Sequence, residues 1–485
     1  MLSLIIRQTN WSILGACLSF VIGFFLKIYL INIVSLSEYG KYVIGQTLAS
    51  TLDTFLALGL PFLIIKYVPN LIKTNKDQAK KIAGFCLGFS ILIGLVAVIL
   101  ICFFNDFIAE YIYQKSDINY ILCLMSIYIP MSLFMAMIIS LYRSFLKIKE
   151  IVIYGTVFSV LCRAILTFII FFFTDNILFF VLIEIFVQIL TLGILTFKFN
   201  KECLNLQLSL DFKAITSNKV MYAYSKRMFY TSVVAYFGGQ ILAFFVSVYL
   251  SKEDIAAYSV LLSIASITTI LLINLNRVFA PVISKLFSER KMKELSSLYK
   301  ETTFIINFLT MPLVLIVVCF SGEILSLFGE MGNNFHYNKY LILLMCGGLV
   351  SLSAGSSGNF MIMANLEKKN LFIQIIKALI LCSACILFVR EKGLGAVVVI
   401  YLVSMIIVNL TQVVILWLQY RITPYSFKLI KLYIIGFILY LLHSVISIND
   451  ILILNYLILP LLIVITYYSF YKQDIINITN YFEKK

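Results

Sequence analysis

The chain contains fourteen long apolar segments, and these segments constrain its fold more than any other feature. An α-helix needs roughly 20 apolar residues to cross the hydrocarbon core of a bilayer. Strands of a membrane barrel would alternate apolar and polar residues, which these segments do not do. The sequence therefore predicts an all-α polytopic membrane protein with helices near residues 9–33, 41–68, 82–104, 118–142, 151–173, 177–197, 228–250, 255–283, 302–320, 339–363, 371–389, 396–418, 429–446 and 451–471.

Composition agrees with this fold and excludes several other classes of protein. Apolar residues make up 62% of the chain and charged residues 13%, against roughly 45–50% and about 25% in soluble domains. That charge is too sparse to cover the surface of a soluble enzyme. Nearly all of the ten cysteines lie inside apolar segments, so we expect small buried side chains rather than a disulfide framework.

Lysine and arginine residues are distributed unevenly over the two sides of the predicted membrane domain. With a cytoplasmic N-terminus, 28 of them lie in the tails and loops of that side and six lie on the other. Because positive residues gather on the cytoplasmic side, both termini and the segment 199–227 are predicted to be cytoplasmic. The net charge of +15 is thus explained by topology and requires no nucleic acid as a partner.

An internal repeat is visible at an offset of 216 residues, which aligns Glu38 with Asp254 and Tyr42 with Tyr258. Each block opens an even-numbered helix that leads into a basic loop. A repeat of equal orientation is typical of transporters with two related halves. We therefore predict two pseudo-symmetric six-helix lobes, 1–199 and 228–420, a cytoplasmic linker, 200–227, and two extra helices with a tail, 421–485.

The linker between the two predicted lobes begins with a run in which every second residue is leucine. Such alternation fits a short extended stretch that lies along the membrane surface. The residues concerned are Leu204, Leu206, Leu208 and Leu210.

Ionisable residues at bilayer depth are costly, by about 2.5–3.5 kcal/mol each on insertion scales, and each requires a reason. Arg163 lies near the middle of the fifth predicted helix. Its guanidinium fork suits a pyrophosphate group that enters a cavity. The alternative is an ion pair with Glu184, because a hairpin that turns near Asp175 places the two residues at depths that differ by roughly 4–5 Å.

Three more cations and one more acid lie inside predicted helices. We expect Lys27, Lys377 and Arg277 to join Arg163 as substrate-binding cations, although each could instead extend to the membrane surface. Asp53 and Glu184 are candidate coupling acids, because burial disfavours the charged form of a carboxyl and eases proton uptake. Asp53 could alternatively pair with Lys27.

Other polar residues lie within these helices without carrying charge. They could bind sugar hydroxyls or form hydrogen bonds between helices. His443 lies outside the duplicated part and is expected to be structural. The uncharged set is Gln46, Gln188, Gln240, Asn359, Gln374, Asn409 and Gln412.

The sequence lacks the motifs of nucleotide hydrolysis and of catalysis. It contains no GxxxxGK[ST] phosphate loop and no HExxH metal pair, and no nucleophile motif with a positioned base. We therefore expect a transporter rather than an enzyme, with no cofactor and no metal. Its energy would then come from a proton or sodium gradient or from later consumption of the substrate.

Several short motifs resemble those of one transporter family. The block Leu36–Tyr42, followed by Leu58-Gly59-Leu60-Pro61, resembles the opening of polysaccharide-biosynthesis flippases. Ala257-Tyr258-Ser259 and the segment Asn276–Pro281 resemble their second-half signature, and Phe328-Gly329-Glu330 a third motif. The ordered set is most similar to the Wzx-type O-antigen flippases, a MATE-like branch of the multidrug/oligosaccharidyl-lipid/polysaccharide exporters. One departure is the seventh helix, which has Gly238, Gly239 and Gln240 where many relatives carry an Asp-Arg-type pair.

The resemblance implies a function and a setting. It implies a V-shaped pair of lobes that alternate access in the bacterial inner membrane. The substrate would be a polyprenyl-pyrophosphate-linked oligosaccharide repeat unit of O-antigen, a part of lipopolysaccharide, or of a similar surface polysaccharide. Implied partners are this lipid-linked oligosaccharide, membrane lipids, a polysaccharide polymerase and a chain-length regulator.

Two alternative functions remain open at the level of the sequence. An ion-coupled exporter of drugs or other small molecules could have the same overall fold, although the excess of membrane-embedded cations disfavours cationic drugs. A polysaccharide polymerase or ligase usually works on large outside loops. The longest such loops here are shorter than about 20 residues, which leaves little room for a catalytic site.

Overall fold

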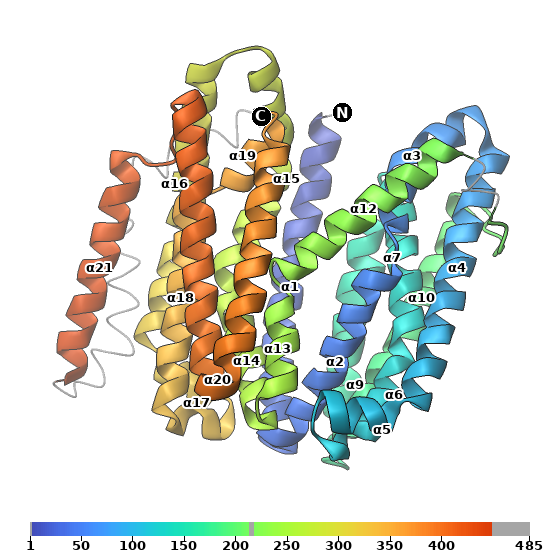
Figure 1. The fold of residues 1–485 in the computed structure, drawn as a ribbon, viewed down its shortest axis with the longest axis horizontal. Coiled ribbons are helices and arrows are strands. Elements are labelled where there is room, and N and C mark those ends of the chain that lie inside the picture. Colours follow the sequence, from blue (N-terminus) through green and yellow to red (C-terminus); the bar gives the residue numbers. More distant parts are fainter. Residues whose placement is uncertain (1, 213–217, 449–485) are drawn as a thin grey trace. The chain divides into compact units, whose positions relative to one another are not determined.

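The computed structural model describes residues 2–212 and 218–448, and every regular element in this part of the chain is helical (Figure 1). Within residues 2–212 and 218–448, nine helices are long and apolar enough to span a membrane, or up to twelve if each bent pair forms one span. Every predicted segment falls on helices except 451–471, which lies outside the described residues. The predicted all-α polytopic membrane fold is confirmed.

Contacts divide the chain into two compact units. The first comprises Met1–Val260 and Leu371–Ser404. Its helices are α1 (Leu2–Val34), α2 (Leu36–Leu56), α3 (Leu60–Thr74), α4 (Lys76–Phe103), α5 (Asn105–Phe107), η1 (Ile108–Ile112), η2 (Ser116–Ile118), α6 (Asn119–Ser126), α7 (Tyr128–Ser144), α8 (Ile148–Glu150), η3 (Ile151–Val157), α9 (Phe158–Ile170), α10 (Ile177–Glu202), α12 (Lys219–Phe237), α13 (Ile241–Tyr249) and the start of α14 (Lys252–Ala265).

The second unit comprises Leu261–Asn370 and Met405–Lys485. The 54-residue α20 (Glu367–Tyr420) runs through both units and covers two predicted spans, which meet at the kink of Gly393 (φ 62°). The other helices of this unit are α15 (Ile267–Ser288), α16 (Met292–Cys319), α17 (Ser321–Ser326), η4 (Gly329–Asn333), α18 (Phe335–Ala354), α19 (Ser357–Met363) and α21 (Phe427–Ile448).

The motif Leu58-Gly59-Leu60-Pro61 breaks a helix. Leu58 and Gly59 have φ angles of 47° and 72°, a left-handed conformation that glycine adopts without steric cost. Pro61 then lies in the first turn of α3, where its missing N–H is tolerated. As a result, α2 and α3 meet at a bend of 48°.

The glycine pair of the seventh predicted helix also marks a break. Residues 238–240 form a turn between α12 and α13, which bend by 51° relative to each other. The Ser225 hydroxyl of α12 donates a 2.8 Å hydrogen bond to the Leu58 carbonyl. The helix α12 therefore contacts the first break, at Leu58, through Ser225 and ends at the second break.

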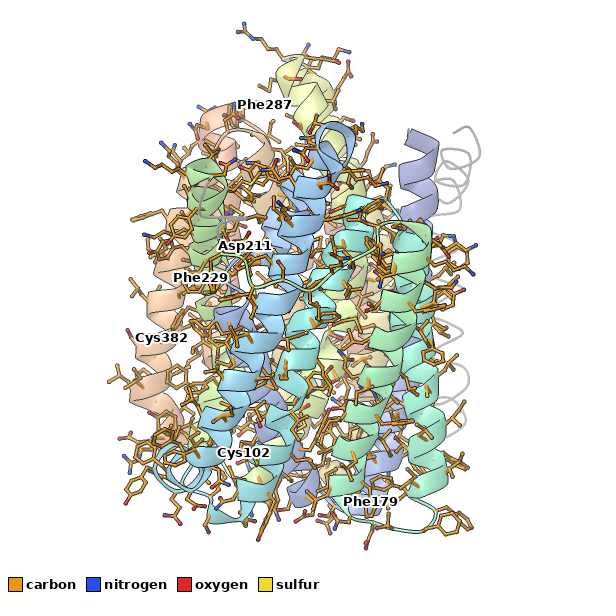
Figure 2. All side chains as sticks on the ribbon, turned by 90° about the vertical axis from the view of Figure 1, so that its right-hand side faces the viewer. Cys102, Phe179, Asp211, Phe229, Phe287 and Cys382 are labelled. Atoms are coloured by element: carbon orange, nitrogen blue, oxygen red, sulfur yellow. A yellow bond between two sulfur atoms is a disulfide. The ribbon has the colours of Figure 1, made fainter. Side chains whose placement is uncertain are left out.

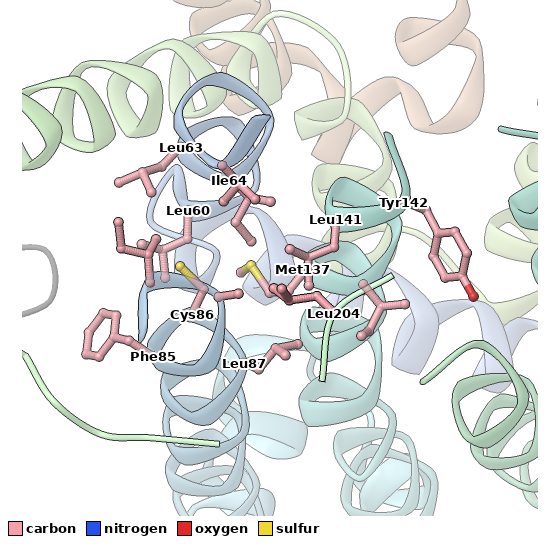
Figure 3. Close-up of a cluster of buried hydrophobic side chains, with 14 of the residues drawn as sticks. Leu60, Leu63, Ile64, Phe85, Cys86, Leu87, Met137, Leu141, Tyr142 and Leu204 are labelled. Atoms are coloured by element: carbon pink, nitrogen blue, oxygen red, sulfur yellow. The ribbon is translucent and has the colours of Figure 1, made fainter. Parts of the chain in front are cut away.

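The core of the first unit lies where α3, α4, α7 and α10 meet. Leu63, Ile64 and Met137 are fully buried there and lie close together (Figure 3). The hydroxyl of buried Tyr142 donates a 2.8 Å hydrogen bond to the Leu195 carbonyl of α10. The corresponding core of the second unit packs Met311 and Leu315 of α16 against α21.

Large apolar side chains also cover much of the outer surface of the helices. Such a surface fits contact with lipid rather than with water. Among the most exposed in the first unit are Ile99, Phe103, Phe168, Phe172 and Phe173.

Each of the two copies of the repeated block begins with a serine that caps the N-terminus of its helix. The Ser35 hydroxyl accepts a hydrogen bond from the backbone N–H of Glu38 (3.4 Å). The Ser251 hydroxyl accepts the same bond from Asp254 (3.2 Å). Both pairs are related by the offset of 216 residues, so the caps that start α2 and α14 are part of the repeat.

Candidate functional site

The centre of the candidate site is an ion pair between α9 and α10. Arg163 Nη1 lies 2.7 Å from Glu184 Oε1, as the predicted hairpin allows. The Glu184 side chain is 4% exposed and that of Arg163 is 26% exposed. Within the described residues, Arg163 Nε is buried and makes no hydrogen bond. The guanidinium therefore has donor capacity beyond its carboxylate partner.

Three tyrosines lie near this ion pair. Tyr39 and Tyr42 of α2 are buried, and both interact electrostatically with Glu184 and Arg163. Tyr128 of α7 does so as well. Sequence reasoning assigned none of them to the site. The signal was present, because Tyr39 and Tyr42 belong to the Leu36–Tyr42 block.

Lys27 connects α1 to the second copy of the repeated block. Its Nζ donates hydrogen bonds to the carbonyl and to the hydroxyl of Ser259, both at 3.2 Å. Nζ also lies 5.8 Å from the centre of the Tyr39 ring. Lys27 is half-buried and directed to polar partners within the unit.

Asp53 does not form the ion pair with Lys27 that the sequence left open. Its Oδ1 instead accepts a 2.6 Å hydrogen bond from the Ser132 hydroxyl of α7. Two residues earlier in α2, the Thr51 hydroxyl lies 2.8 Å from the Tyr236 hydroxyl of α12. Asp53 is thus an acid inside the helical bundle, with a neutral partner.

Of the two remaining predicted cations, Lys377 and Arg277, the structure describes the side chain of Lys377. Lys377 is half-buried on α20 and forms no ion pair with any described residue. Arg277 lies on α15, and its side chain is outside the described residues. The structure thus brings Arg163, Glu184 and Lys27 into one polar region with the tyrosines, and it does not join Asp53 or Lys377 to that region through a described hydrogen bond.

Two of the uncharged polar residues make described side-chain hydrogen bonds: Asn409 donates to the Met405 carbonyl of its own helix, whereas Gln412 bonds to other helices. Gln412 Oε1 accepts a hydrogen bond from the Ser357 hydroxyl (2.7 Å), and Gln412 Nε2 donates to Asn370 Oδ1 (2.9 Å). His443 Nε2 lies 2.7 Å from the Cys319 carbonyl. Gln412 and His443 hold helices of the second unit together.

A second group of charges lies at one end of the first unit, and we call it the Asp117 cluster: Glu38, Lys41, Asp117 and Lys252. Asp117 forms ion pairs with Lys41 (3.1 Å) and with Lys252, and Lys41 also pairs with Glu38. The backbone of Gly40 approaches that of Lys252 so closely that a Cβ atom would clash. The two copies of the repeated block therefore meet at this cluster.

Lys115 supports the same end of the unit. Its Nζ donates hydrogen bonds to the carbonyls of Tyr113, Ser247 and Val248, at 3.0–3.3 Å. The last two belong to the final turn of α13, where carbonyls lack helical partners and attract cations. Burial, followed by the nearby charge of Lys252, lowers the pKa of Lys115 to about 8.

The cysteines were expected to be small buried side chains rather than parts of a disulfide framework, and one pair departs from this expectation. Cys102 at the end of α4 and Cys123 in α6 form a disulfide, with Cα atoms 5.0 Å apart. Cys102 lies in the last turn of α4 (Figure 2) and Cys123 in the middle of α6, and the chain reverses between them through α5, η1 and η2, which brings the thiols together. Spacing within apolar segments could not reveal this, because it does not show which faces of the helices meet.

Comparisons with known proteins now place the chain in a family. A model of the family described as "Polysaccharide biosynthesis protein" matches residues 30–336. A search of curated proteins by sequence finds no match.

Solved structures with the same fold include a flippase and two transporters. The lipid II flippase MurJ in an inward closed conformation is 17% identical, covers 96% of this chain and 99% of its own, and gives a TM-score of 0.75. A multidrug resistance MATE family transporter of the MOP superfamily, in an outward-facing conformation, is 13% identical and covers 87% and 95%, with a TM-score of 0.61. A MOP superfamily transporter from Pyrococcus furiosus is 14% identical and covers 87% and 96%, with a TM-score of 0.60. The family match extends over more than half of the chain, which therefore belongs to the polysaccharide biosynthesis protein family and has a multi-pass membrane fold like that of MATE transporters and MurJ.

Proposed function

We propose that this transporter is a flippase for polyprenyl-pyrophosphate-linked oligosaccharide repeat units of O-antigen or of a similar surface polysaccharide. The observation that carries the proposal is the Arg163 side chain, which is paired with Glu184 at 2.7 Å inside the helical bundle yet remains 26% exposed. A guanidinium that is partly exposed and has donors beyond those used by its carboxylate partner can bind phosphate oxygens through its fork. The family description and the fold shared with a lipid II flippase support the same substrate class.

The other charges have proposed roles in the same cycle. Lys27, Lys377 and Arg277 add positive charge that attracts the pyrophosphate. Glu184 holds the Arg163 guanidinium in place, since a buried carboxylate at 2.7 Å restricts its rotamers. After translocation, the lipid-linked unit would pass to a polysaccharide polymerase whose product length a chain-length regulator sets.

A glycan-export complementation assay tests the role of Arg163. Arg163→Gln should reduce export by more than about tenfold, which corresponds to the loss of a hydrogen bond to a charged group. Arg163→Lys should keep partial export, because it retains the charge and loses the bidentate fork. The matched control is Lys147→Gln, which removes a cation from an exposed ion pair with Glu202, also at 2.7 Å. Equal export by Arg163→Gln and the control would contradict the proposal.

We further propose that Asp53 couples transport to an ion gradient. Asp53 lies inside the bundle and accepts a hydrogen bond from Ser132, a partner without charge. Burial therefore disfavours its ionised form, which suits uptake and release of a proton. In proteoliposomes with an imposed pH gradient, Asp53→Asn should transport at a rate that no longer depends on the gradient. Wild-type dependence in this variant would show that coupling does not involve Asp53.

We propose that the protein resides in the bacterial inner membrane with both termini in the cytoplasm. The 28-to-6 distribution of Lys and Arg supports this orientation. The disulfide adds support, because Cys102 and Cys123 flank the segment 105–117, which contains a single Lys and no Arg, and disulfides persist in oxidising compartments. In a cysteine-free variant, Glu110→Cys should react with an impermeant maleimide from outside and Asn75→Cys should not. The reverse pattern would overturn the orientation.

An ion-coupled exporter of small molecules is the second candidate. Its support is the shared fold with a MATE family multidrug transporter, which covers 87% of the chain. The two candidates differ in substrate, so a transport assay separates them. Arg163-dependent export of a cationic dye, with unchanged glycan export in Arg163→Gln, would favour the exporter.

A further inference from the structure

A cavity in the first unit has no role in the proposed transport cycle. Its volume is about 330 Å³, within the roughly 300–1,000 Å³ typical of ligand sites. It lies where α3, α4 and α12 meet the segment that follows α10. Six aromatic side chains line it: Phe85, Phe89, Phe212, Tyr222, Phe229 and Tyr230.

One wall of the cavity is the linker segment, which is fixed against α4. The N–H of Ser209 donates a 3.1 Å hydrogen bond to the Gly84 carbonyl. A Cβ atom on Gly84 or Gly88 would collide with the linker backbone, so both positions require glycine for this approach. Phe212 then packs edge-on against Phe85, with ring centres 5.2 Å apart.

The opposite wall is one face of α12. Tyr222, Lys226, Phe229 and Tyr230 follow each other at spacings of four, three and one residues, which places them on the same side of a helix. The Ser225 hydroxyl anchors this helix to the Leu58 carbonyl. Both walls are therefore held in place by hydrogen bonds.

The leucine alternation of the linker indicates that this cavity lies beside the acyl region of a membrane. Leu204 is buried in the core of the unit, and Leu206 packs against it. Leu208 and Leu210 continue the same alternation but are 59% and 51% exposed. A regular apolar face that begins in the protein core and continues outside it is suited to the acyl region of a membrane.

The cavity carries one cation among its aromatic walls. Lys226 is exposed and forms no ion pair with any residue that the structure describes. An apolar cavity with a lysine at its lining matches a molecule with a hydrocarbon chain and an anionic head. The lining is mostly apolar, and its Ser225 hydroxyl already donates to the Leu58 carbonyl, so it suits a hydrocarbon chain better than an oligosaccharide.

We propose that this cavity binds one anionic phospholipid, with an acyl chain between the aromatic walls and its phosphate at Lys226. Basic residues at a membrane surface attract anionic lipids. Bound lipid would also fix the position of α12 beside the break at Leu58 and Gly59. The inference does not depend on which glycan the transporter moves.

The test is lipid retention by the purified full-length protein in native mass spectrometry. The probes are phosphatidylglycerol and phosphatidylcholine with identical acyl chains. The wild type should retain one phosphatidylglycerol in preference to phosphatidylcholine. Lys226→Glu should weaken that preference by about tenfold, and Lys226→Arg should preserve it. The matched control is Lys219→Glu, which reverses a charge on the same helix outside the cavity.

Three results would overturn the proposal. The wild type could retain both lipids equally, or Lys226→Glu could behave as Lys219→Glu does. Polyprenyl phosphate could displace phosphatidylglycerol completely in a manner that depends on Lys226, in which case the cavity belongs to the transport substrate. If Lys226→Glu elutes as an aggregate, Lys226→Gln gives the same comparison with a smaller expected loss.

Discussion

Two groups of charged residues in the first unit use the same chemistry in different surroundings. The Arg163–Glu184 pair joins α9 and α10 across 2.7 Å, with the carboxylate 4% exposed. In the Asp117 cluster, Asp117 holds Lys41 and Lys252 while 44% of its own side chain is exposed. Water can replace any partner in the cluster, but it cannot reach Glu184 (4% exposed). The energetic importance of an ion pair here therefore follows from burial rather than from distance.

The largest expected effect is the loss of one partner of the buried pair. Glu184→Gln leaves the Arg163 charge without compensation, which costs about 3–5 kcal/mol at a buried site. The expected result is a sharp drop in thermal stability and in the yield of monodisperse protein in detergent. If Glu184→Gln is as stable as the wild type, water solvates Arg163, and the loss of its partner leaves no uncompensated buried charge.

A smaller effect is expected where the two copies of the repeated block meet. Gly40→Ala places a Cβ against the Lys252 backbone, and such overpacking costs about 1–3 kcal/mol. The matched control is Gly193→Ala in α10, where nothing lies within 4 Å of an added Cβ; it should be neutral or slightly stabilising. Thermal unfolding of both variants measures the difference, and equal stability would mean that the block contact is loose.

The pH dependence of stability gives a third comparison. Because the pKa of Lys115 is lowered from 10.5 to about 8, the unfolded chain binds a proton between these values that the folded chain does not. Stability from this group therefore rises as pH increases from about 8 to 10.5. Thermal unfolding at pH 7.5 and 9.5 should show this rise in the wild type and a smaller rise in Lys115→Met. Identical changes of stability with pH in the wild type and in Lys115→Met would contradict a lowered pKa of Lys115.

The smallest effect belongs to the ion pairs of the Asp117 cluster. Asp117→Asn should change the free energy of unfolding by less than about 1 kcal/mol, because exposed pairs gain little and salt screens them. The change should shrink further in concentrated salt. A loss as large as that of Glu184→Gln would remove the distinction between the two groups.

Much of the fold was predictable because membrane spans depend on local composition. Long apolar segments located the helices, and the hairpin between α9 and α10 predicted the pairing of Arg163 with Glu184. The repeat was also visible, and its serine caps at Ser35 and Ser251 extend it.

What the sequence could not show is how each helix is rotated about its axis. Packing determines this rotation, so the tyrosines around Arg163 and the hydrogen bonds of Lys27 to Ser259 were not predicted. The Cys102–Cys123 disulfide escaped prediction for the same reason. Asp53 was recognised as a membrane-embedded acid, but its partner Ser132 lies 79 residues away in sequence.

The most direct measurement of the central claim is glycan export by the charge-neutral double variant Arg163→Gln/Glu184→Gln. Its control is Lys147→Gln/Glu202→Gln, which neutralises an exposed ion pair of the same length. No uncompensated buried charge remains in the first variant, so it should fold and insert almost as well as the wild type. We predict that it nevertheless fails to export glycan while the control exports normally. Full export by Arg163→Gln/Glu184→Gln would contradict substrate binding by Arg163 and leave the pair a structural role alone.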